Sequence, residues 1–493
     1  MNEEWVETEE TGAAEKARER AAEDTPAEEK QEDKALRARL CYNQKNGYDR
    51  IGTDERLALE EYCEDYKAFL DTARTERLAV QEAVRQAEER GFVPFTAGMA
   101  LAPGMKLYRV NRGKSLLLAV VGKKPLESGC VVAAAHIDSP RLDLKPVPLF
   151  EDGEMAYFKT HYYGGIKKYQ WVTIPLELHG VVVLKSGETV EISIGREPED
   201  PQFVITDLLI HLAQEQMQKK GTELVRGEAL NLLIGGVPYD DGGKERVKLA
   251  VLSLLEDAYG ITEEDFLSAE LEAVPAFDSR DVGLDRSFIG GYGHDDRVCA
   301  YAELRALLDL KEPETTAVCI LADKEEIGSE GTSGMQSEAF ECFMEDLCAA
   351  QGASLRHCFA HSLCISADVC NAFDPLYPEV SEKRNNARCN YGMGICKYTG
   401  SRGKSGTNDA DAETVGRLRR IFSDAGVIWQ TAELGKVDQG GGGTVAVYMA
   451  RRNIATIDAG VPVLSMHAPF EIVAKLDCYM TYKGIRTVYE AGV

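Results

Sequence analysis

Apolar residues recur along the first third of the chain with two different periods. In residues 54–90 they return at steps of three and four, which predicts helix. Between residues 106 and 135, three short apolar runs, KLYRV, SLLLAVV and CVVAAA, are separated by Asn-Arg-Gly and Lys-Pro turns. They predict a hairpin that leads into a buried strand. A helical segment at residues 54–90 is therefore expected to precede a sheet.

Residues 147–281 have a different pattern. They contain the alternating stretch VVVLKSGETVEISI, a Pro-Glu-Asp-Pro break, and amphipathic pieces around residues 207–219 and 247–258. Alternation over a stretch of this length is typical of strands with one buried face. No cluster of metal-binding side chains is evident in this segment. We expect an inserted β-rich domain with a few helices.

From residue 282 onward, strand-like runs alternate with helical patterns. The runs TAVCILAD, HSLCISAD and ATIDAGVPVLSM alternate with the helical stretches VCAYAELRALLDL and DAETVGRLRRIFSDAG. This alternation predicts an α/β layer with a largely parallel sheet. Residues 41–146 and 282–493 are then two halves of one domain, 147–281 is the insertion, and 1–40 is an N-terminal arm.

The composition narrows the class of protein. A net charge of −26 argues against a nucleic-acid partner, because two polyanions repel each other. Residues 1–35 hold 13 acidic residues against 5 basic ones, which predicts a solvated arm, either a frayed helix or a disordered tail. The 13 scattered cysteines are typical of reduced, buried thiols and of the cytoplasm. Without a signal-like start or a long apolar run, neither secretion nor a membrane partner is expected.

Five short segments carry side chains that bind metal ions, each in a turn or at the end of an expected strand. Placed together, these groups would concentrate uncompensated charge unless cations lay among them. Two divalent ions need a bridging carboxylate, terminal ligands and a separate carboxylate that accepts a proton from water. The candidates are His136 and Asp138 in AAAHIDSPRLDLK, Asp295 and Asp296 in GYGHDDRVCA, Glu325 and Glu326 in LADKEEIGSEG, Asp368 in ISADVCNAFDP, and His467 in LSMHAPFEI.

This ordered set of motifs resembles the M18 group of metallopeptidases, which includes aspartyl aminopeptidase and aminopeptidase I. The resemblance runs from about residue 47 to the C-terminus. It implies a cis peptide bond between Asp295 and Asp296. It also implies the following roles: His136, Asp295, Glu326, Asp368 and His467 as metal ligands with Asp295 bridging, Glu325 as the general base, and Asp138 as the carboxylate that orients His136.

The same resemblance implies the fold and the activity. The expected fold is a three-layer α/β/α metallopeptidase domain with an inserted β-rich dimerisation domain, assembled as a homo-oligomer of twelve subunits arranged as a tetrahedron. The implied activity is removal of the N-terminal residue from peptides that have a free N-terminus. Two Zn²⁺ ions per subunit are expected, although Co²⁺ and Mn²⁺ accept the same ligand types.

Substrate contacts are less well defined. Arg384 and Asn385 lie where the family places substrate-binding residues, with a surface loop as the alternative. Gly441 and Gly442, in DQGGGGTVAVYMA, are candidates for close backbone approach to substrate, with a flexible turn as the alternative. The inserted segment reads GGIKKYQW where aspartyl aminopeptidases carry a histidine-containing segment. The preference between acidic and neutral N-terminal residues therefore stays open.

Two other functions share parts of this pattern. A metal-dependent amidase or deacylase of small molecules would use the same metal site without requiring a free peptide amine. A catalytically silent assembly protein would keep the fold without the chemistry, but the intact Glu325 argues against it.

Overall fold

The computed structural model describes residues 27–240 and 242–493, in two units, Met1–Asn46 and Gly47–Val493. In the first unit, Ala27–Leu40 form helix α2, and the side chains of residues 33–40 are exposed. Part of the predicted acidic arm is thus a solvated helix. Residues 1–26, which make up the rest of that arm, lie outside the described residues.

A nine-stranded sheet forms the centre of the second unit. Strands β13, β4, β14 and β18 are parallel neighbours, so their carboxyl ends meet at one edge. These are the runs that the sequence predicts as buried strands. In spatial order the strands are β1 (Val93–Pro94), β2 (Lys106–Asn111), β3 (Ser115–Val120), β13 (Ala317–Ala322), β4 (Val131–His136), β14 (Leu363–Ser366), β18 (Ala455–Gly460), β16 (Met393–Cys396) and β17 (Trp429–Thr431).

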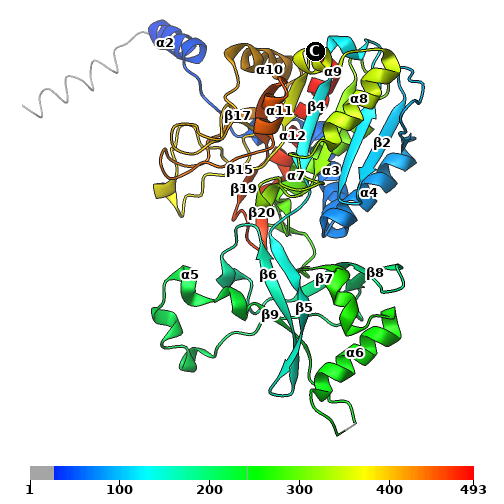
Figure 1. Ribbon diagram of the computed structural model, residues 1–493. Helices are drawn as coiled ribbons and strands as arrows, with labels where there is room; N and C mark the ends of the chain where they lie inside the picture. The colour runs from blue at the N-terminus through cyan, green and yellow to red at the C-terminus, as the bar shows by residue number, and fades with distance from the viewer. Residues whose placement is uncertain (1–26, 241) are drawn as a thin grey trace, which may run out of the picture. The chain divides into compact units, whose positions relative to one another are not determined.

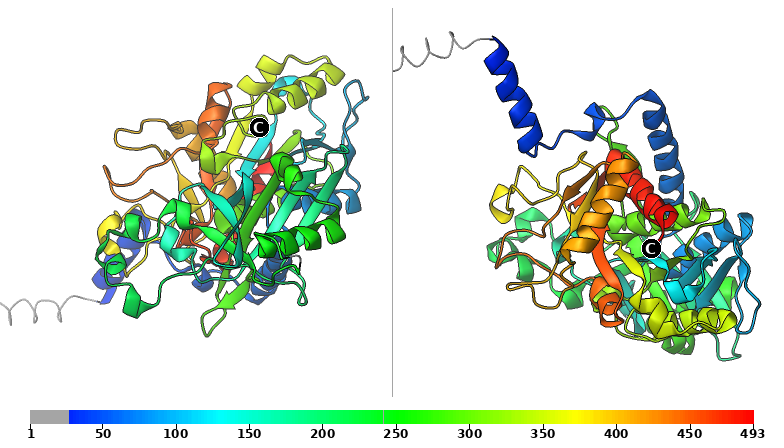
Figure 2. Two further views of the ribbon diagram at one scale, coloured as in Figure 1. Left: turned by 60° about the horizontal axis from the view of Figure 1, so that its bottom comes forward. Right: turned by 90° about the horizontal axis from the view of Figure 1, so that it is seen from above.

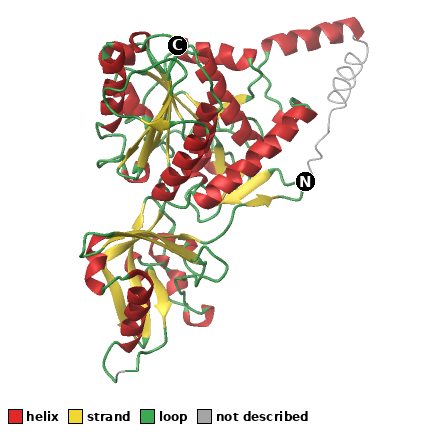
Figure 3. Ribbon diagram, turned by 90° about the vertical axis from the view of Figure 1, so that its right-hand side faces the viewer, coloured by secondary structure: helices red, strands yellow, loops and turns green. Residues whose placement is uncertain are grey.

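Helices cover both faces of this sheet (Figure 3). Along β4, Val131, Ala133 and Ala135 belong to one core, whereas Val132 and Ala134 belong to the other. The right-hand view of Figure 2 shows α12 in red and α8 in yellow-green on the two sides. The predicted three-layer α/β/α arrangement is confirmed. The first core includes α3 (Thr53–Thr72), α4 (Glu76–Glu89), α7 (His294–Leu308), α10 (Ala412–Asp424) and α12 (Lys475–Ala491), and the second α8 (Ala339–Gln351), α9 (Leu355–Ala360) and α11 (Ala446–Arg451).

The helical pattern of residues 54–90 is two helices rather than one. α3 ends at Thr72, and Thr75 caps α4 because its side-chain oxygen accepts the backbone N–H of Leu78. Within the described ranges, the helices are all too short or too polar to cross a bilayer. All 13 cysteines are free thiols and ten are buried, as their apolar surroundings predict.

A second, antiparallel sheet of six strands has its own core around Trp171, with α6 (Arg246–Tyr259) packed beside it (Figure 1). Five of these strands lie within residues 147–281, where the sequence alternates, and β5 begins just before that segment. In spatial order they are β8 (Thr189–Ile194), β7 (Leu176–Val183), β10 (Ala269–Pro275), β5 (Arg141–Asp152), β6 (Met155–Tyr163) and β9 (Asn231–Gly235).

The amphipathic piece at residues 207–219 does not form the expected helix. It contains only the 3-10 turns Ile210–Leu212 and Gln216–Gln218. Its large apolar side chains are exposed, and an amphipathic helix needs a surface on which to bury its apolar face. The spacing of apolar residues alone therefore predicted the wrong secondary structure for residues 207–219.

A third sheet of five short strands lies next to the parallel strand ends. β12 precedes Asp295, β15 follows Asp368, and His467 lies in the turn between β19 and β20. This small sheet therefore joins three candidate segments. Its strands are β11 (Arg280–Val282), β12 (Phe288–Gly291), β20 (Glu471–Ala474), β19 (Pro462–Leu464) and β15 (Cys370–Asn371).

Buried ion pairs join the six-stranded sheet to helix α4. Arg141, on β5, lies 3.1 Å from Glu76 of α4, 2.8 Å from Asp143, and 3.2 Å from Glu272 of β10. Arg141, Glu76 and Glu272 are all buried. Moving helix α4 away from the sheet would leave these buried charges uncompensated. The ion pairs therefore fix the position of α4 against the six-stranded sheet.

We expect Arg141→Ala to lower the free energy of unfolding by about 3–5 kcal/mol, the usual cost of breaking a buried ion pair. Arg85→Ala is the matched control, since Arg85 pairs with Glu82 and Glu89 at the surface and should cost under about 1 kcal/mol. Urea denaturation followed by tryptophan fluorescence measures both. If both substitutions lowered the free energy of unfolding by the same small amount, the stabilising role of the Arg141 ion pairs would be contradicted.

Candidate metal centre

Three of the predicted segments meet at the carboxyl edge of the parallel strands. His136 is the last residue of β4, Asp368 follows β14, and Glu325 and Glu326 begin the 3-10 turn Glu325–Ile327 that follows β13. Because β13, β4 and β14 are neighbours in the sheet, the topology alone brings these side chains together.

Two more segments arrive from the five-stranded sheet. Asp295 lies at the start of α7, where its backbone and that of Asp296 are not yet helical. The peptide bond between them is cis, as predicted. His467 lies in the β19–β20 turn with a φ of 64°, a left-handed conformation that is rare for a residue with a side chain. Such conformations persist where surrounding contacts enforce them.

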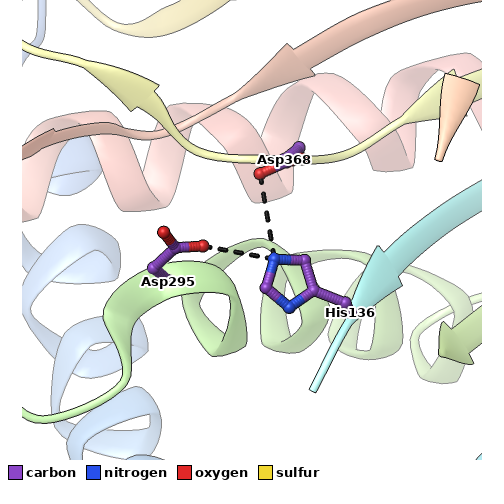
Figure 4. Close-up of side chains that lie close together, drawn as sticks. All are labelled: His136, Asp295 and Asp368. Carbon is purple, nitrogen blue, oxygen red and sulfur yellow. Dashed lines mark ion pairs between the residues drawn. The ribbon is translucent and has the colours of Figure 1, made fainter. Parts of the chain in front are cut away.

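The side chains form two trios that share Asp295. Within each trio the ligand atoms lie within 4.8 Å of one another: His136, Asp295 and Asp368 in the first, and Asp295, Glu326 and His467 in the second. His136 Nε2 is 3.2 Å from Asp295 Oδ1 and 4.0 Å from Asp368 Oδ1 (Figure 4). On the other side, His467 Nε2 is 3.1 Å from Asp295 Oδ2 and 3.5 Å from Glu326 Oε1. Asp295 thus offers one oxygen to each trio.

The cluster holds more negative charge than its histidines balance. Burial raises the pKa of Glu326 and Asp368 well above the usual value, and neighbouring carboxylates add to both shifts. Burial, with the charges of Asp138 and Asp295, also raises the pKa of Glu325 to about 6, against the opposing effect of His136. Carboxyl groups that resist ionisation in this way need protons or cations nearby.

The two histidines shift in the opposite sense. Burial alone would lower the pKa of His467, but the hydrogen bond to Asp295 and the charge of Glu326 raise it to about 10. For His136, hydrogen bonds to Asp138 and Asp295 likewise outweigh burial and raise the pKa well above its usual value. Each imidazole is therefore held in a field that favours positive charge at its Nε2 side, where a cation would fit.

Buried oxygens without hydrogen-bond partners mark the same place. Both carboxylate oxygens of Asp296 and Oε1 of Glu326 are among the buried side-chain atoms of the described residues that have no hydrogen-bond partner. Glu326 Oε1 faces His467 Nε2. Since buried polar atoms nearly always make hydrogen bonds, a buried carboxylate oxygen that makes none and lies within a trio of candidate ligands fits a metal ion.

Asp138 holds the turn that carries the two glutamates. Its Oδ1 accepts the backbone N–H of Glu325 at 3.1 Å, and its Oδ2 accepts that of Glu326 at 3.2 Å. His136 Nδ1 lies 3.0 Å from the carbonyl oxygen of Asp138 and 3.4 Å from its Oδ1. The residue predicted to orient His136 thus touches it mainly through the backbone, while its carboxylate fixes the Glu325–Glu326 turn.

Glu471 holds the other two ligand segments in the same way. Its Oε2 accepts the backbone N–H of Asp295 at 3.0 Å, and its Oε1 accepts that of His467 at 2.6 Å. Glu471 is 2% exposed. The sequence analysis missed this residue. The available signal was an acidic residue, four positions after His467, at the start of an apolar stretch.

Comparison with known proteins identifies the family. Residues 69–489 match the model of the family described as "Aminopeptidase I zinc metalloprotease (M18)". The chain belongs to this M18 family. A probable M18 family aminopeptidase 1 of Clostridium acetobutylicum is 48% identical over 454 residues, which cover 90% of this chain and 98% of that protein.

Solved structures of M18 proteins share the fold. The crystal structure of an M18 family aminopeptidase from Thermotoga maritima superposes with a TM-score of 0.88 at 47% identity, covering 91% of this chain and 99% of that one. That of aminopeptidase I from Clostridium acetobutylicum gives 0.86 at 46% identity, with the same coverage of each chain.

A cavity of about 680 Å³ lies beside the candidate metal centre of this M18 protein. Its lining includes His467 and Asn371, together with Gly165, Ile166, Lys167, Tyr169 and Gln170 of the segment that follows β6. Lys167 and Asp374 bring charges of both signs, and Met466 adds apolar surface. The cavity is therefore large enough for a side chain and chemically mixed.

The predicted substrate-contact residues lie outside the ligand trios. Arg384 and Asn385 are exposed in a loop where Glu382 accepts both of their backbone N–H groups. Gly441 has a φ of 115°, and a Cβ there would lie 2.4 Å from the carbonyl oxygen of Gly400. Packing between two loops thus explains glycine at 441, and around Gly442 the nearest neighbour to a Cβ would be Leu434.

We expect Glu471→Gln to weaken zinc binding by about tenfold or more, as lost outer hydrogen bonds to ligands usually do. The amide keeps one oxygen, so either Asp295 or His467 loses the acceptor of its backbone N–H. Competition with a colorimetric chelator measures the affinity. The surface change Glu490→Gln is the control, and equal zinc affinity in the two variants would show that Glu471 does not position the ligands.

Proposed function

We propose that this M18 protein is a two-metal aminopeptidase that removes the N-terminal residue of peptides. The observation that carries the proposal is the position of Asp295, which supplies one carboxylate oxygen to each ligand trio. A carboxylate shared in this way is what a pair of adjacent divalent ions requires.

In this proposal, His136 and Asp368 would hold one ion, Glu326 and His467 would hold the other, and Asp295 would offer one carboxylate oxygen to each. Zinc is the proposed metal, since the family is one of zinc metalloproteases. When bound, zinc would polarise the scissile carbonyl group and lower the pKa of a coordinated water molecule.

Glu325 is the proposed general base. Its Oε2 lies 3.8 Å from His136 Nε2, so it borders the cluster without belonging to either trio. Its side chain is 19% exposed, whereas that of Glu326 is 4% exposed. Glu325 can therefore reach water and substrate, accept the proton of the attacking water and pass it to the leaving amine.

The cavity beside His467 is the proposed site for the substrate's first residue. A free α-amino group would bind near the carboxylates of the cluster, which restricts cleavage to the N-terminal peptide bond. Arg384, Asn385, Gly441 and Gly442 remain proposed contacts for more distant parts of the substrate. The 13 free thiols suit a reducing compartment, and we propose the cytoplasm.

A panel of aminoacyl-nitroanilides and matched N-acetylated compounds tests this function, with and without chelator. Aminopeptidase activity requires hydrolysis of the free-amine compounds only, loss of activity with chelator, and recovery with zinc. Hydrolysis of the acetylated compounds would favour the amidase or deacylase alternative. A protein that binds zinc but cleaves none of them would be the silent assembly protein.

The two adjacent glutamates should fail differently when each is changed to glutamine. In Glu325→Gln, zinc content should match the wild type while kcat falls by about 10²- to 10⁴-fold, the usual range for a lost general base. In Glu326→Gln, an anionic ligand becomes neutral, so zinc should be lost and excess zinc should restore part of the activity. Metal analysis and turnover decide it, and the reverse pattern would mean that the roles are exchanged.

We also propose that the chain forms a homo-oligomer through the six-stranded sheet unit, acting as a dimerisation domain. Residues 208–212 expose Leu208, Leu209, Ile210 and Leu212 by 55–73%. Exposed large apolar side chains gathered in one short segment are typical of protein contacts. Twelve subunits, as the M18 resemblance implies, would give a light-scattering mass of about twelve times 54.2 kDa.

The double variant Leu209→Asp and Leu212→Asp should give smaller species in light scattering, because charged side chains would replace the apolar contact. An unchanged mass would place the contact elsewhere.

A further inference from the structure

The turn at the end of strand β6 reaches the metal centre from the six-stranded sheet. Tyr163 ends β6, and Gly164 and Gly165 follow it. The Tyr163 hydroxyl donates a hydrogen bond to Asp138 Oδ2 at 2.8 Å, and the Gly165 carbonyl accepts one from His467 Nδ1 at 2.8 Å. Three consecutive residues of this turn thus touch the ligand cluster or its supports.

The Tyr163 hydroxyl acts through Asp138. It binds the same oxygen, Oδ2, that accepts the backbone N–H of Glu326. Tyr163 is 7% exposed and Asp138 is fully buried, so water is a poor substitute for this bond. The Tyr163 ring is itself held, because the Arg141 guanidinium lies 4.0 Å from its centre. Losing the hydroxyl would loosen Asp138 and with it the Glu325–Glu326 turn.

The Gly165 carbonyl fixes the orientation of His467. Because it is an acceptor, it holds the proton on Nδ1 and leaves Nε2 to face Asp295 and Glu326. The His467 side chain is 35% exposed, against 2% for His136. Packing restrains it less, so this hydrogen bond matters more for its position.

Gly164 sits where no side chain fits easily. Its φ is +75°, and an added Cβ would lie 3.2 Å from Glu326 Oε2 and 3.4 Å from Glu326 Cβ. The positive φ and the close contact therefore both favour glycine where the turn approaches Glu326. The close approach is what allows Tyr163 and Gly165 to reach their partners on either side.

We propose that the turn Tyr163–Gly165 is a positioning element of the metal centre. It keeps Asp138 and His467 in their metal-binding arrangement. Retention of metal therefore depends on the position of the six-stranded sheet, which carries the turn. The inference rests on the proposed function, because it assumes that the two ligand trios bind zinc. A turn that merely packed against the cluster would affect stability but leave zinc release unchanged.

The first test compares Tyr163→Phe with Tyr162→Phe. Tyr162 is the preceding residue of β6 and is 41% exposed. With zinc-loaded protein and excess colorimetric chelator, Tyr163→Phe should release zinc about tenfold faster than wild type, near the lower end of the effect of losing an outer partner. Its kcat should fall by a similar factor while KM stays within about twofold. Tyr162→Phe should match the wild type in all three.

The second test separates the close approach from backbone strain. Gly164→Ala places a methyl group against Glu326, whereas Gly153→Ala, in the hairpin between β5 and β6, has a φ of 59° and no atom within 4 Å of an added Cβ. Both substitutions strain the backbone. Only Gly164→Ala should speed zinc release, and this pair keeps the proposal testable if Tyr163→Phe folds poorly.

The outcomes distinguish the two proposals. Zinc release and kcat in Tyr163→Phe and Gly164→Ala that equal their controls would overturn the positioning role and leave the metal site intact. A wild-type protein that takes up no zinc would overturn both the metal site and the role of the turn. Faster release in both variants, with controls unchanged, supports the inference.

Discussion

The Asp295 carboxylate lies between two imidazoles, one oxygen toward His136 and the other toward His467. Three further carboxylates, from Glu325, Glu326 and Asp368, crowd the same buried space. Such a concentration of negative charge is costly in a protein interior unless cations compensate it. The surrounding structure serves to hold these groups together against their mutual repulsion.

Two buried carboxylates outside the trios fix the segments that carry the candidate ligands. Asp138 accepts the backbone N–H groups of Glu325 and Glu326, and Glu471 accepts those of Asp295 and His467. Each fixes ligand-bearing backbone rather than a ligand side chain. Parallel strands bring one half of the cluster together, and the small five-stranded sheet brings the other, so these two carboxylates brace ligand segments on both sides.

Much of this could be predicted from the sequence because the signals are local. Apolar runs mark β4, β13 and β14, and the candidate metal ligands lie at or just after their ends, so parallel topology brings them together. The M18 resemblance supplied the family and the fold class, and both are confirmed. Contacts between distant segments gave no local signal: Gly165 and His467 are 302 positions apart, and Glu471 resembles the ordinary start of a strand. At residues 207–219 the apolar period suggested a helix, but no core faces it.

Anomalous X-ray diffraction from zinc-loaded crystals tests the central claim most directly. The account predicts two zinc peaks about 3.5–4 Å apart, bridged by Asp295. One peak should contact His136 and Asp368, and the other Glu326 and His467. A single peak, or peaks away from Asp295, would contradict the two-metal centre.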